Sequence, residues 1–231
     1  MALHSPKESN RCLVVFLRYP EPGKVKTRLA KTCGDPFAAE LYGYFVDDLL
    51  EALAPGSYHL ELFFTPAERE TEIRQRFGAR YCYSPQEGEG LGERMEKAFR
   101  ACFAKGFSTA ILIGSDAPDL TTEFIDQAFL ALENGQDAVV GPAFDGGYYL
   151  IGFRSATFDP AVFSGMRWGE NSVFENTLNH LQARKYRIHL APVWHDIDTG
   201  KDLENLQARH ANTAFSRSRT MTFLQNRLGQ E

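Results

Sequence analysis

Short, continuous apolar runs alternate along this chain with longer segments in which apolar residues recur every three or four positions. The run CLVVFL (residues 12–17) is typical of a strand buried on both faces of a parallel sheet, because no polar residue interrupts it. Apolar residues at every fourth position from Phe37 to Leu49 predict a helix of about 18 residues. Asp35 is expected to cap that helix, with Pro36 at its first position.

The same alternation continues to the end of the chain and indicates the fold class. Strands are predicted at residues 12–17, 59–64, 80–84, 109–116, 137–142, 147–153 and 186–197. Further helices are predicted at residues 67–77, 91–103, 121–132 and 173–184, and from residue 211 onward. Because right-handed crossovers join alternating strands and helices, we expect an α/β fold with a mostly parallel sheet and helices on both faces. Residues 11–231 are expected to form this single domain, after a short disordered lead at residues 1–10.

Composition limits the kinds of protein this can be. Of the 231 residues, 43% are apolar and 24% are charged, as in ordinary globular proteins, and no apolar run approaches the roughly 18 residues that span a bilayer. The net charge of −5 argues against nucleic-acid binding, because affinity for a phosphate backbone needs a basic surface. The polar first ten residues lack the apolar segment of a signal peptide, and the cysteines form no CxxC pair. We therefore expect a cytosolic protein with free thiols and no structural zinc, membrane or nucleic-acid partner; the pattern leaves its oligomeric state open.

The first candidate for chemistry is the loop that follows the strand at residues 12–17. In PEPGKVKTR (residues 20–28), proline and glycine predict a rigid turn on which basic side chains converge. Positive charge beside backbone N–H groups suits a diphosphate, and an ordinary polar loop is the alternative. Ser115 and Arg94 are two further candidates for contacts to the nucleotide. The candidate nucleotide-binding residues within the loop are Pro22, Gly23, Lys24, Lys26 and Arg28.

The second candidate is the segment GSDAPDL, which places Asp116 at the end of a predicted strand. One or two carboxylates can hold Mg²⁺ or Mn²⁺ while substrate phosphates and water complete the coordination. The alternative is that Asp116 caps a helix, although Asp119 directly precedes the next predicted helix and is expected to be its cap. The late segment HDIDTGKDL supplies Asp196 and Asp198 on one side of the chain, and we expect Asp198 to be the second metal ligand.

The third candidate is the segment GPAFDGGYYLIG, which connects two predicted strands. Gly146 and Gly147 would let the backbone approach a sugar or an acceptor closely. Asp145 can accept hydrogen bonds from hydroxyl groups in such a pocket. A plain turn between the two strands is the alternative.

Together these segments resemble a bacterial family of GT-A-fold, glycosyltransferase-like proteins of the arsenosugar-biosynthesis type, formerly labelled a domain of unknown function. The resemblance rests on RYPEPGKVKTRL, GSDAPDL, GPAFDGGYYLIG, WGENSVF and DIDT, which follow the family's order over about residues 12–205. Each motif alone is unspecific, but their conjunction is specific. More distantly, the chain is similar to 2-phospholactate guanylyltransferase and the molybdopterin nucleotidyltransferases, which share the fold. Arg18 departs from the family, whose loop usually has lysine there, and a forked guanidinium could select a different partner.

The resemblance implies a metal-dependent transferase that moves a sugar from a nucleotide diphosphate sugar to a small-molecule acceptor. Lys26 and Arg28 would bind the diphosphate, and Asp116 and Asp198 would hold Mg²⁺ or Mn²⁺. Catalysis would then come largely from stabilising the departing diphosphate.

Four alternatives concern the acceptor side and the reaction itself. Trp168 and Glu170 lie in a segment that could contact the acceptor, although Trp168 could equally pack in the core. An inverting transfer needs a general base near the acceptor, for which Asp145 and Glu170 are the candidates; inversion and retention both stay open. Transfer of a nucleotidyl group from an NTP, with release of pyrophosphate, would use the same loop and metal. The last alternative is a catalytically silent nucleotide-binding protein.

Overall fold

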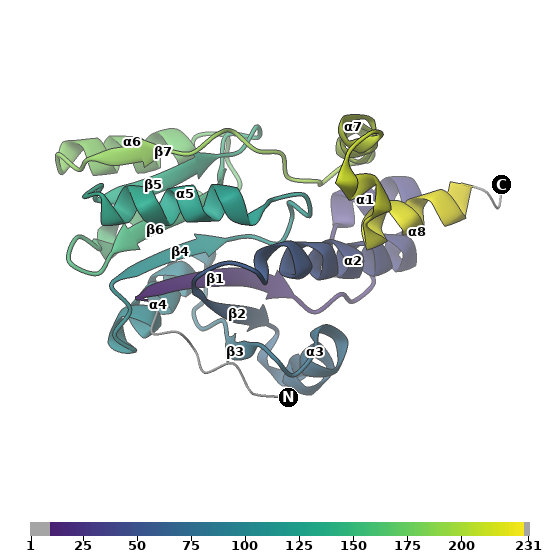
Figure 1. The fold of residues 1–231 in the computed structure, drawn as a ribbon, viewed down its shortest axis with the longest axis horizontal. Helices are drawn as coiled ribbons and strands as arrows, with labels where there is room; N and C mark the ends of the chain where they lie inside the picture. The colour runs from purple at the N-terminus through teal and green to yellow at the C-terminus, as the bar shows by residue number, and fades with distance from the viewer. Residues whose placement is uncertain (1–9, 229–231) are drawn as a thin grey trace.

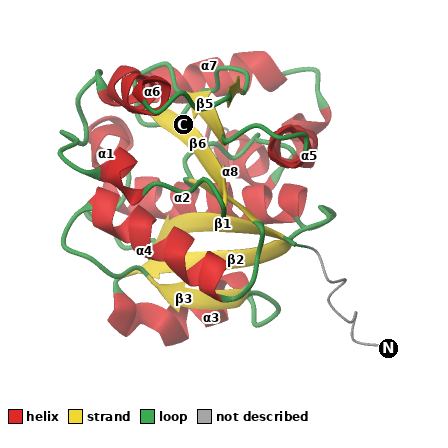
Figure 2. Cartoon of the chain, turned by 90° about the vertical axis from the view of Figure 1, so that its left-hand side faces the viewer, coloured by secondary structure: helices red, strands yellow, loops and turns green. Residues whose placement is uncertain are grey.

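One sheet organises residues 10–228, the part of the chain that the computed structural model describes (Figures 1 and 2). The order across the sheet is β3-β2-β1-β4-β6-β5-β7. β6 runs antiparallel to both of its neighbours, and the other pairings are parallel, which confirms the predicted α/β fold. The strands are β1 (Arg11–Arg18), β2 (His59–Thr65), β3 (Cys82–Pro85), β4 (Thr109–Ile113), β5 (Ala138–Pro142), β6 (Tyr148–Arg154) and β7 (Ile188–Leu190). The expected disordered lead lies outside the described residues, apart from Asn10.

Helices cover both faces of the sheet, as expected for a mostly parallel sheet. Side chains of α2, α3 and α5 pack on one face and those of α4 and α6 on the other, while α8 packs against α2. The helices are α1 (Thr27–Cys33), α2 (Asp35–Leu53), α3 (Glu70–Phe77), α4 (Leu91–Ala104), α5 (Thr122–Glu133), α6 (Val173–Ala183), α7 (Gly200–His210) and α8 (Arg219–Leu228).

The central strand β1 shows why an uninterrupted apolar run suits this sheet. Successive side chains of a strand point to opposite faces. Leu13 and Val15 join the apolar cluster on the side of α2, whereas Cys12 and Val14 join the cluster on the side of α4. All four are fully buried, so a polar side chain pointing to either face would lose its hydrogen bonds to water.

Several predicted boundaries were wrong. The strand expected at residues 186–197 is only β7, because the chain leaves the ladder near Pro192, which has no N–H to donate, and afterwards makes a single bridge between Ala143 and Trp194. The helix α1 interrupts what we expected to be one long loop, and α7 was not predicted. Helix α2 begins at Asp35 itself, so its N-cap is Gly34.

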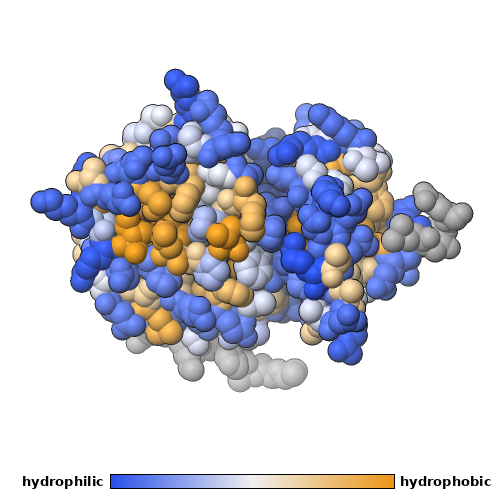
Figure 3. All heavy atoms as spheres, turned by 90° about the horizontal axis from the view of Figure 1, so that it is seen from above, coloured by the Kyte–Doolittle hydropathy of each residue, from blue (hydrophilic) through white to orange (hydrophobic). Residues whose placement is uncertain are grey.

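Three further features concern the helices, the cysteines and the apolar surface. None of the helices that the structure describes is long and apolar enough to cross a membrane. The four cysteines are free, as expected. In Figure 3, apolar side chains gather on the left half of the face, over the end of the sheet that carries β7. Leu190 and Val193, which are 52% and 49% exposed, belong to this end.

Asp119 does not cap the helix α5, because that helix begins at Thr122 with Thr121 as its N-cap residue. The Asp119 carboxylate instead turns toward the C-terminal part of the chain and is almost fully buried. It accepts hydrogen bonds from Trp194 Nε1 at 3.1 Å, Arg209 Nη2 at 2.9 Å and His210 Nε2 at 2.8 Å. These bonds fix the GSDAPDL loop against α7.

Replacement of Asp119 tests this anchor. We expect Asp119→Ala to lower the free energy of unfolding by about 3 kcal/mol, because it leaves Arg209 and two N–H donors without their acceptor. Urea denaturation measures the change. Glu204→Ala, which breaks an exposed pair with Lys201, is the control and should change stability by less than about 0.5 kcal/mol. Equal effects of the two substitutions would contradict the anchoring role.

Candidate active site

A cavity of about 670 Å³ opens beyond the carboxyl ends of β1 and β4, where open parallel sheets bind their ligands. Most of the residues that the sequence nominates line it, although they come from loops far apart in the chain. These are Lys24, Lys26, Arg28, Arg94, Ser115, Asp116, Asp145, Gly147, Trp168, Glu170 and Asp198. Pro22, Gly23 and Gly146 do not line it.

Lys26 lies at the centre of the charged part of the cavity. It is the N-cap residue of α1, and its backbone is left-handed, with φ 47° and ψ 40°, which costs a non-glycine residue roughly 1 kcal/mol. Its Nζ lies 2.5 Å from Oδ1 of Asp116 and 3.0 Å from Oδ1 of Asp198. The lysine side chain is 3% exposed. The buried ammonium therefore joins the segments that follow β1, β4 and β7.

The charges of this cluster set its protonation states. Burial lowers the pKa of Lys26, but the carboxylates of Asp116 and Asp198 outweigh burial and raise the pKa above its usual value. Burial, reinforced by the charge of Asp116, raises the pKa of Asp196 to about 7 despite the opposing charge of Lys26. The ammonium thus stays charged, whereas Asp196 titrates near neutral pH.

The donor set fits a divalent cation. Asp116, Asp145, Asp196 and Asp198 all line the cavity, and Lys26 is the buried ammonium among them. Carboxylate oxygens are the ligands that Mg²⁺ and Mn²⁺ prefer, and a charge of two would balance the excess of carboxylates. Asp116 and Asp198, whose side chains are 46% and 36% exposed, are accessible to such an ion.

Three cations face both this cavity and an adjoining one of about 580 Å³. They are Arg18, Lys24 and Arg94. Within residues 10–228, none of the three pairs with a carboxylate, and Arg94 Nε donates to the carbonyl of Gly88 at 2.9 Å. Arg28 is 65% exposed and lies 3.6 Å from Oδ2 of Asp198. The cavity therefore offers positive charge to an anionic ligand beside the carboxylate cluster.

Tyr42, from the middle of α2, forms part of the wall next to Asp116. Its hydroxyl lies 2.7 Å from Ser115 Oγ and accepts the N–H of Arg18 at 3.0 Å. Burial raises the pKa of Tyr42 to about 12, so the hydroxyl stays protonated. Ser115 is only 4% exposed, and its hydroxyl is engaged by Tyr42.

Trp168 and Tyr148 make the apolar wall of the cavity. Their rings meet edge to face with centroids 6.4 Å apart, and the Tyr148 hydroxyl contacts the Met95 sulfur at 3.8 Å. Trp168 is partly buried against the apolar cluster on this face of the sheet and also lines the cavity. This tryptophan therefore packs partly in the core and partly on the cavity wall, and its contact with an acceptor stays a prediction.

The two candidate bases, Asp145 and Glu170, reach the cavity from different loops. Asp145 Oδ1 accepts the N–H of Gly147 at 2.9 Å, which orients the carboxylate. The Glu170 side chain is 53% exposed, and its nearest cation is Arg167 at 3.8 Å.

Gly146 is needed for a close approach within the protein. Its φ is 86°, and a Cβ there would lie 2.1 Å from the carbonyl oxygen of Asn171. The expectation that this glycine makes room for a ligand is therefore corrected: it makes room for the backbone next to Glu170.

Sequence reasoning missed Tyr42 and ranked Asp196 below Asp198, although both line the cavity. Tyr42 occupies an apolar helix position, so no pattern separates it from a core residue. The signal for Asp196 was present in DIDT, where alternate residues share one side of an extended segment.

Comparisons with known proteins identify the family and the fold of the chain. Residues 49–170, about half of the chain, match the family described as "uncharacterized protein conserved in bacteria (DUF2064)". A crystal structure from Desulfovibrio desulfuricans G20, provisionally assigned as a nucleotide-diphospho-sugar transferase, is 40% identical and covers 96% of each chain with a TM-score of 0.92. The chain belongs to the DUF2064 family. No curated protein matches the sequence.

More distant structures share the fold of this DUF2064 member. A cytidylyltransferase from Leptospira borgpetersenii is 13% identical and covers 96% of this chain and 95% of its own, with a TM-score of 0.58. Rv0371c from Mycobacterium tuberculosis H37Rv, solved as a complex with manganese, is 14% identical and covers 87% and 98%, with a TM-score of 0.52. The fold is thus that of nucleotide-diphospho-sugar transferases and nucleotidyltransferases, as the motifs predicted.

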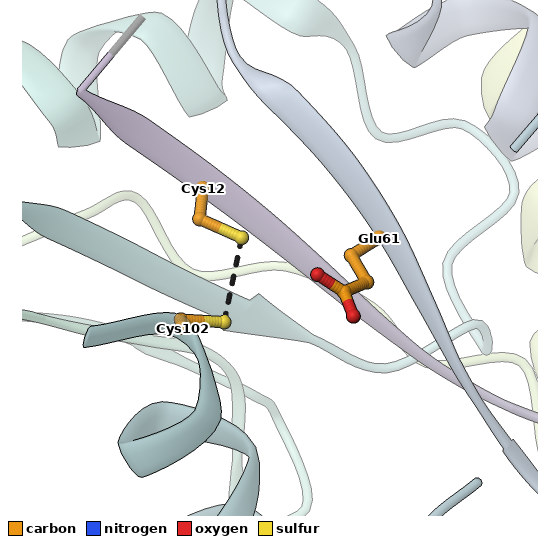
Figure 4. A group of neighbouring side chains, drawn as sticks. All are labelled: Cys12, Glu61 and Cys102. Carbon is orange, nitrogen blue, oxygen red and sulfur yellow. Dashed lines mark hydrogen bonds between the residues drawn. The ribbon is translucent and has the colours of Figure 1, made fainter. Parts of the chain in front are cut away.

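A second group of potential metal ligands lies away from the cavity of this DUF2064 member. Cys12 and Cys102 point toward one another with their sulfurs 3.4 Å apart, and the Glu61 carboxylate lies beside them (Figure 4). Lys105 Nζ lies 2.5 Å from Glu61, and Ser84 Oγ donates to it at 2.7 Å. The ammonium already balances the carboxylate, and the contact with Cys102, reinforced by burial, raises the pKa of the Cys12 thiol. This group is therefore better suited to structure than to metal binding.

The Glu61 carboxylate should make stability depend on acid pH. Burial alone would raise its pKa, but contacts with His59, Lys105 and Ser84 outweigh burial and lower the pKa to about 2. The ionised carboxylate contributes about 3 kcal/mol to the free energy of unfolding. This contribution is complete above about pH 4.5 and disappears as the pH falls toward 2. Urea denaturation should show Glu61→Gln less stable than the parent at pH 7, with the difference shrinking at pH 3. A constant difference would contradict this assignment.

The close approach at Gly146 predicts a stability difference between two glycines. Gly146→Ala and Gly169→Ala both place a side chain at positive φ, which costs about 1 kcal/mol, but only Gly146 has a backbone atom in the way. We expect Gly146→Ala to cost at least about 1 kcal/mol more than Gly169→Ala in urea denaturation. Equal costs would show that the loop of Asn171 yields freely.

Proposed function

We propose that this protein is a metal-dependent glycosyltransferase that takes a nucleotide diphosphate sugar as donor and a small molecule as acceptor. The observation that carries the proposal is the cluster of Lys26, Asp116 and Asp198 in a cavity that also offers cations with no carboxylate partner among the described residues. The provisional assignment of the 40% identical Desulfovibrio structure supports the same class of reaction.

The diphosphate would bind at the basic side of the cavity. Lys26 and Arg28 would contact its oxygens. Both residues lie beside Asp198, and the metal ion that this carboxylate would help to hold would also bind the diphosphate. Asp116 and Asp198 would hold Mg²⁺ or Mn²⁺, and the manganese complex of the Mycobacterium fold relative is consistent with that choice. When bound, the ion would supply positive charge that stabilises the departing diphosphate.

The acceptor would lie against the apolar wall. Trp168 and Tyr148 offer ring surfaces on which a small molecule can pack, and they exclude water from that side. Asp145 or Glu170 would take the proton of an attacking hydroxyl if the transfer inverts the anomeric centre. Gly147 helps by holding the Asp145 carboxylate in place.

Nucleotidyl transfer is the second candidate, and one observation favours it. Arg18, Lys24 and Arg94 pair with no carboxylate within residues 10–228, so the cavity offers three cations in addition to Lys26 and Arg28. An NTP would bring a third phosphate to these cations. The reaction would then release pyrophosphate.

The cysteines bear on where the protein acts. All four are free, and buried Cys12 and Cys102 lie close together without a bond. Unpaired thiols are typical of a reducing compartment, which supports the proposed cytosolic location.

Substitution of a metal ligand tests the proposal. We expect Asp116→Asn to lower turnover in Mn²⁺ by about a hundredfold or more, because it removes charge needed to hold the ion that stabilises the leaving group. Steady-state release of nucleoside diphosphate measures the effect. Glu204→Gln, on the exposed side of α7, should leave turnover unchanged. Parental turnover in Asp116→Asn would refute the metal site.

The donor separates the two candidate reactions. UDP-glucose, GDP-mannose, GTP and CTP are each incubated with the protein and Mn²⁺, and the products are resolved by chromatography. Nucleoside diphosphate from a sugar nucleotide supports glycosyl transfer. Pyrophosphate from an NTP, without cleavage of a sugar nucleotide, supports nucleotidyl transfer instead.

A further inference from the structure

We propose that Lys26 is the resident cation of the candidate metal site in the free protein. Its ammonium fills the position between Asp116 and Asp198, so a divalent ion gains both carboxylates only when that ammonium leaves. The inference rests on the proposed function for the identity of the metal ligands. It adds that the metal and the substrate phosphate bind cooperatively through one lysine.

The two cations would need the same oxygens. Lys26 Nζ contacts Oδ1 of Asp116 and Oδ1 of Asp198, at 2.5 and 3.0 Å. Mg²⁺ binds its oxygen ligands at about 2.0–2.1 Å, so an ion bridging these two atoms would overlap the space of the ammonium. Two cations at such a separation also repel each other. The Lys26 ammonium must therefore leave before an ion can bridge these two oxygens.

The surroundings of Lys26 indicate where its ammonium can go. The ring of Phe45, which is fully buried, lies 5.8 Å from Nζ, so movement past it would bury a charge without a partner. The cavity is the remaining direction, because Lys26 lines it together with the exposed Arg28. An ammonium that turns into the cavity reaches the place proposed for the substrate phosphates.

Phosphate would then exchange partners with the metal. A phosphate in the cavity gives the Lys26 ammonium a new anion, which frees Asp116 and Asp198 for the ion. Linkage requires the reverse as well: the ion, by releasing Lys26, strengthens phosphate binding by the same factor. Couplings of this kind typically span about 5- to 150-fold in affinity.

Binding of Mn²⁺ alone tests the competition directly. We expect Lys26→Met to bind Mn²⁺ at least about tenfold more tightly than the parent, because the competing ammonium is gone. Lys31→Met is the matched control, since it removes an equal charge from an exposed position of α1 that does not line the cavity, and it should change the affinity by no more than about twofold. Electron paramagnetic resonance of free Mn²⁺ gives both affinities. Unchanged or weaker binding by Lys26→Met, or an equal gain in both variants, overturns the inference.

A measurement on the unmodified chain covers the case in which Lys26→Met does not fold. Lysines are acetylated with a water-soluble ester with and without Mn²⁺, and the labelling of Lys26 and Lys24 is read by mass spectrometry. We expect Mn²⁺ to increase labelling of Lys26, which leaves its buried position, while Lys24 stays constant. No increase at Lys26 at a Mn²⁺ concentration that saturates the protein overturns the inference.

Failure of the inference and failure of the proposed function give different results. If Asp116→Asn and Asp198→Asn bind Mn²⁺ as well as the parent does, the metal site itself is wrong, and with it the proposed function. If both lose Mn²⁺ but Lys26→Met gains nothing, the metal uses the outer oxygens of the carboxylates. In that case only the competition with Lys26 is refuted.

Discussion

The pair of contacts that Lys26 makes to Asp116 and Asp198 determines the shape of the candidate site. These residues stand in the segments after β1, β4 and β7. A backbone hydrogen bond from Ile197 N–H to the carbonyl of Asp116, at 2.9 Å, joins the last two segments. The buried ammonium ties the segment after β1 to both of them through two short charged contacts. The left-handed backbone of Lys26 is a strain that persists because the surrounding charges hold its side chain in place.

The same contacts divide the cavity into two chemical halves. On the side of β1, cations such as Arg18 and Lys24 have no carboxylate within the described residues, and on the side of β6, Trp168 and Tyr148 present rings. The carboxylates of Asp116 and Asp198 line the same cavity. Under the proposed function, a charged donor and a less polar acceptor would meet in this cavity, as transfer between two substrates requires.

Much of the fold and part of the site could be predicted from local pattern. Uninterrupted apolar runs predicted β1 and β4, because a strand with two buried faces has no polar position. The residues that follow these strands reach the cavity because an open parallel sheet binds its ligands beyond the carboxyl ends of its strands. Contacts between distant segments could not be predicted. Asp119 looked like a cap, yet its partner Arg209 lies 90 positions away. Gly146 looked like a ligand contact, because only the structure shows the backbone that it accommodates.

The anchor at Asp119 has a consequence for the C-terminal part of the chain. Asp119 follows Asp116 by three residues in one rigid loop, and it is bonded to Arg209 and His210 at the end of α7. The segment that carries Asp198 leads directly into α7 as well. Both proposed metal ligands thus depend on α7 staying docked. Proteolytic removal of the chain from α7 onward would take this anchor away from both candidate ligands while leaving the strands of the sheet in the chain.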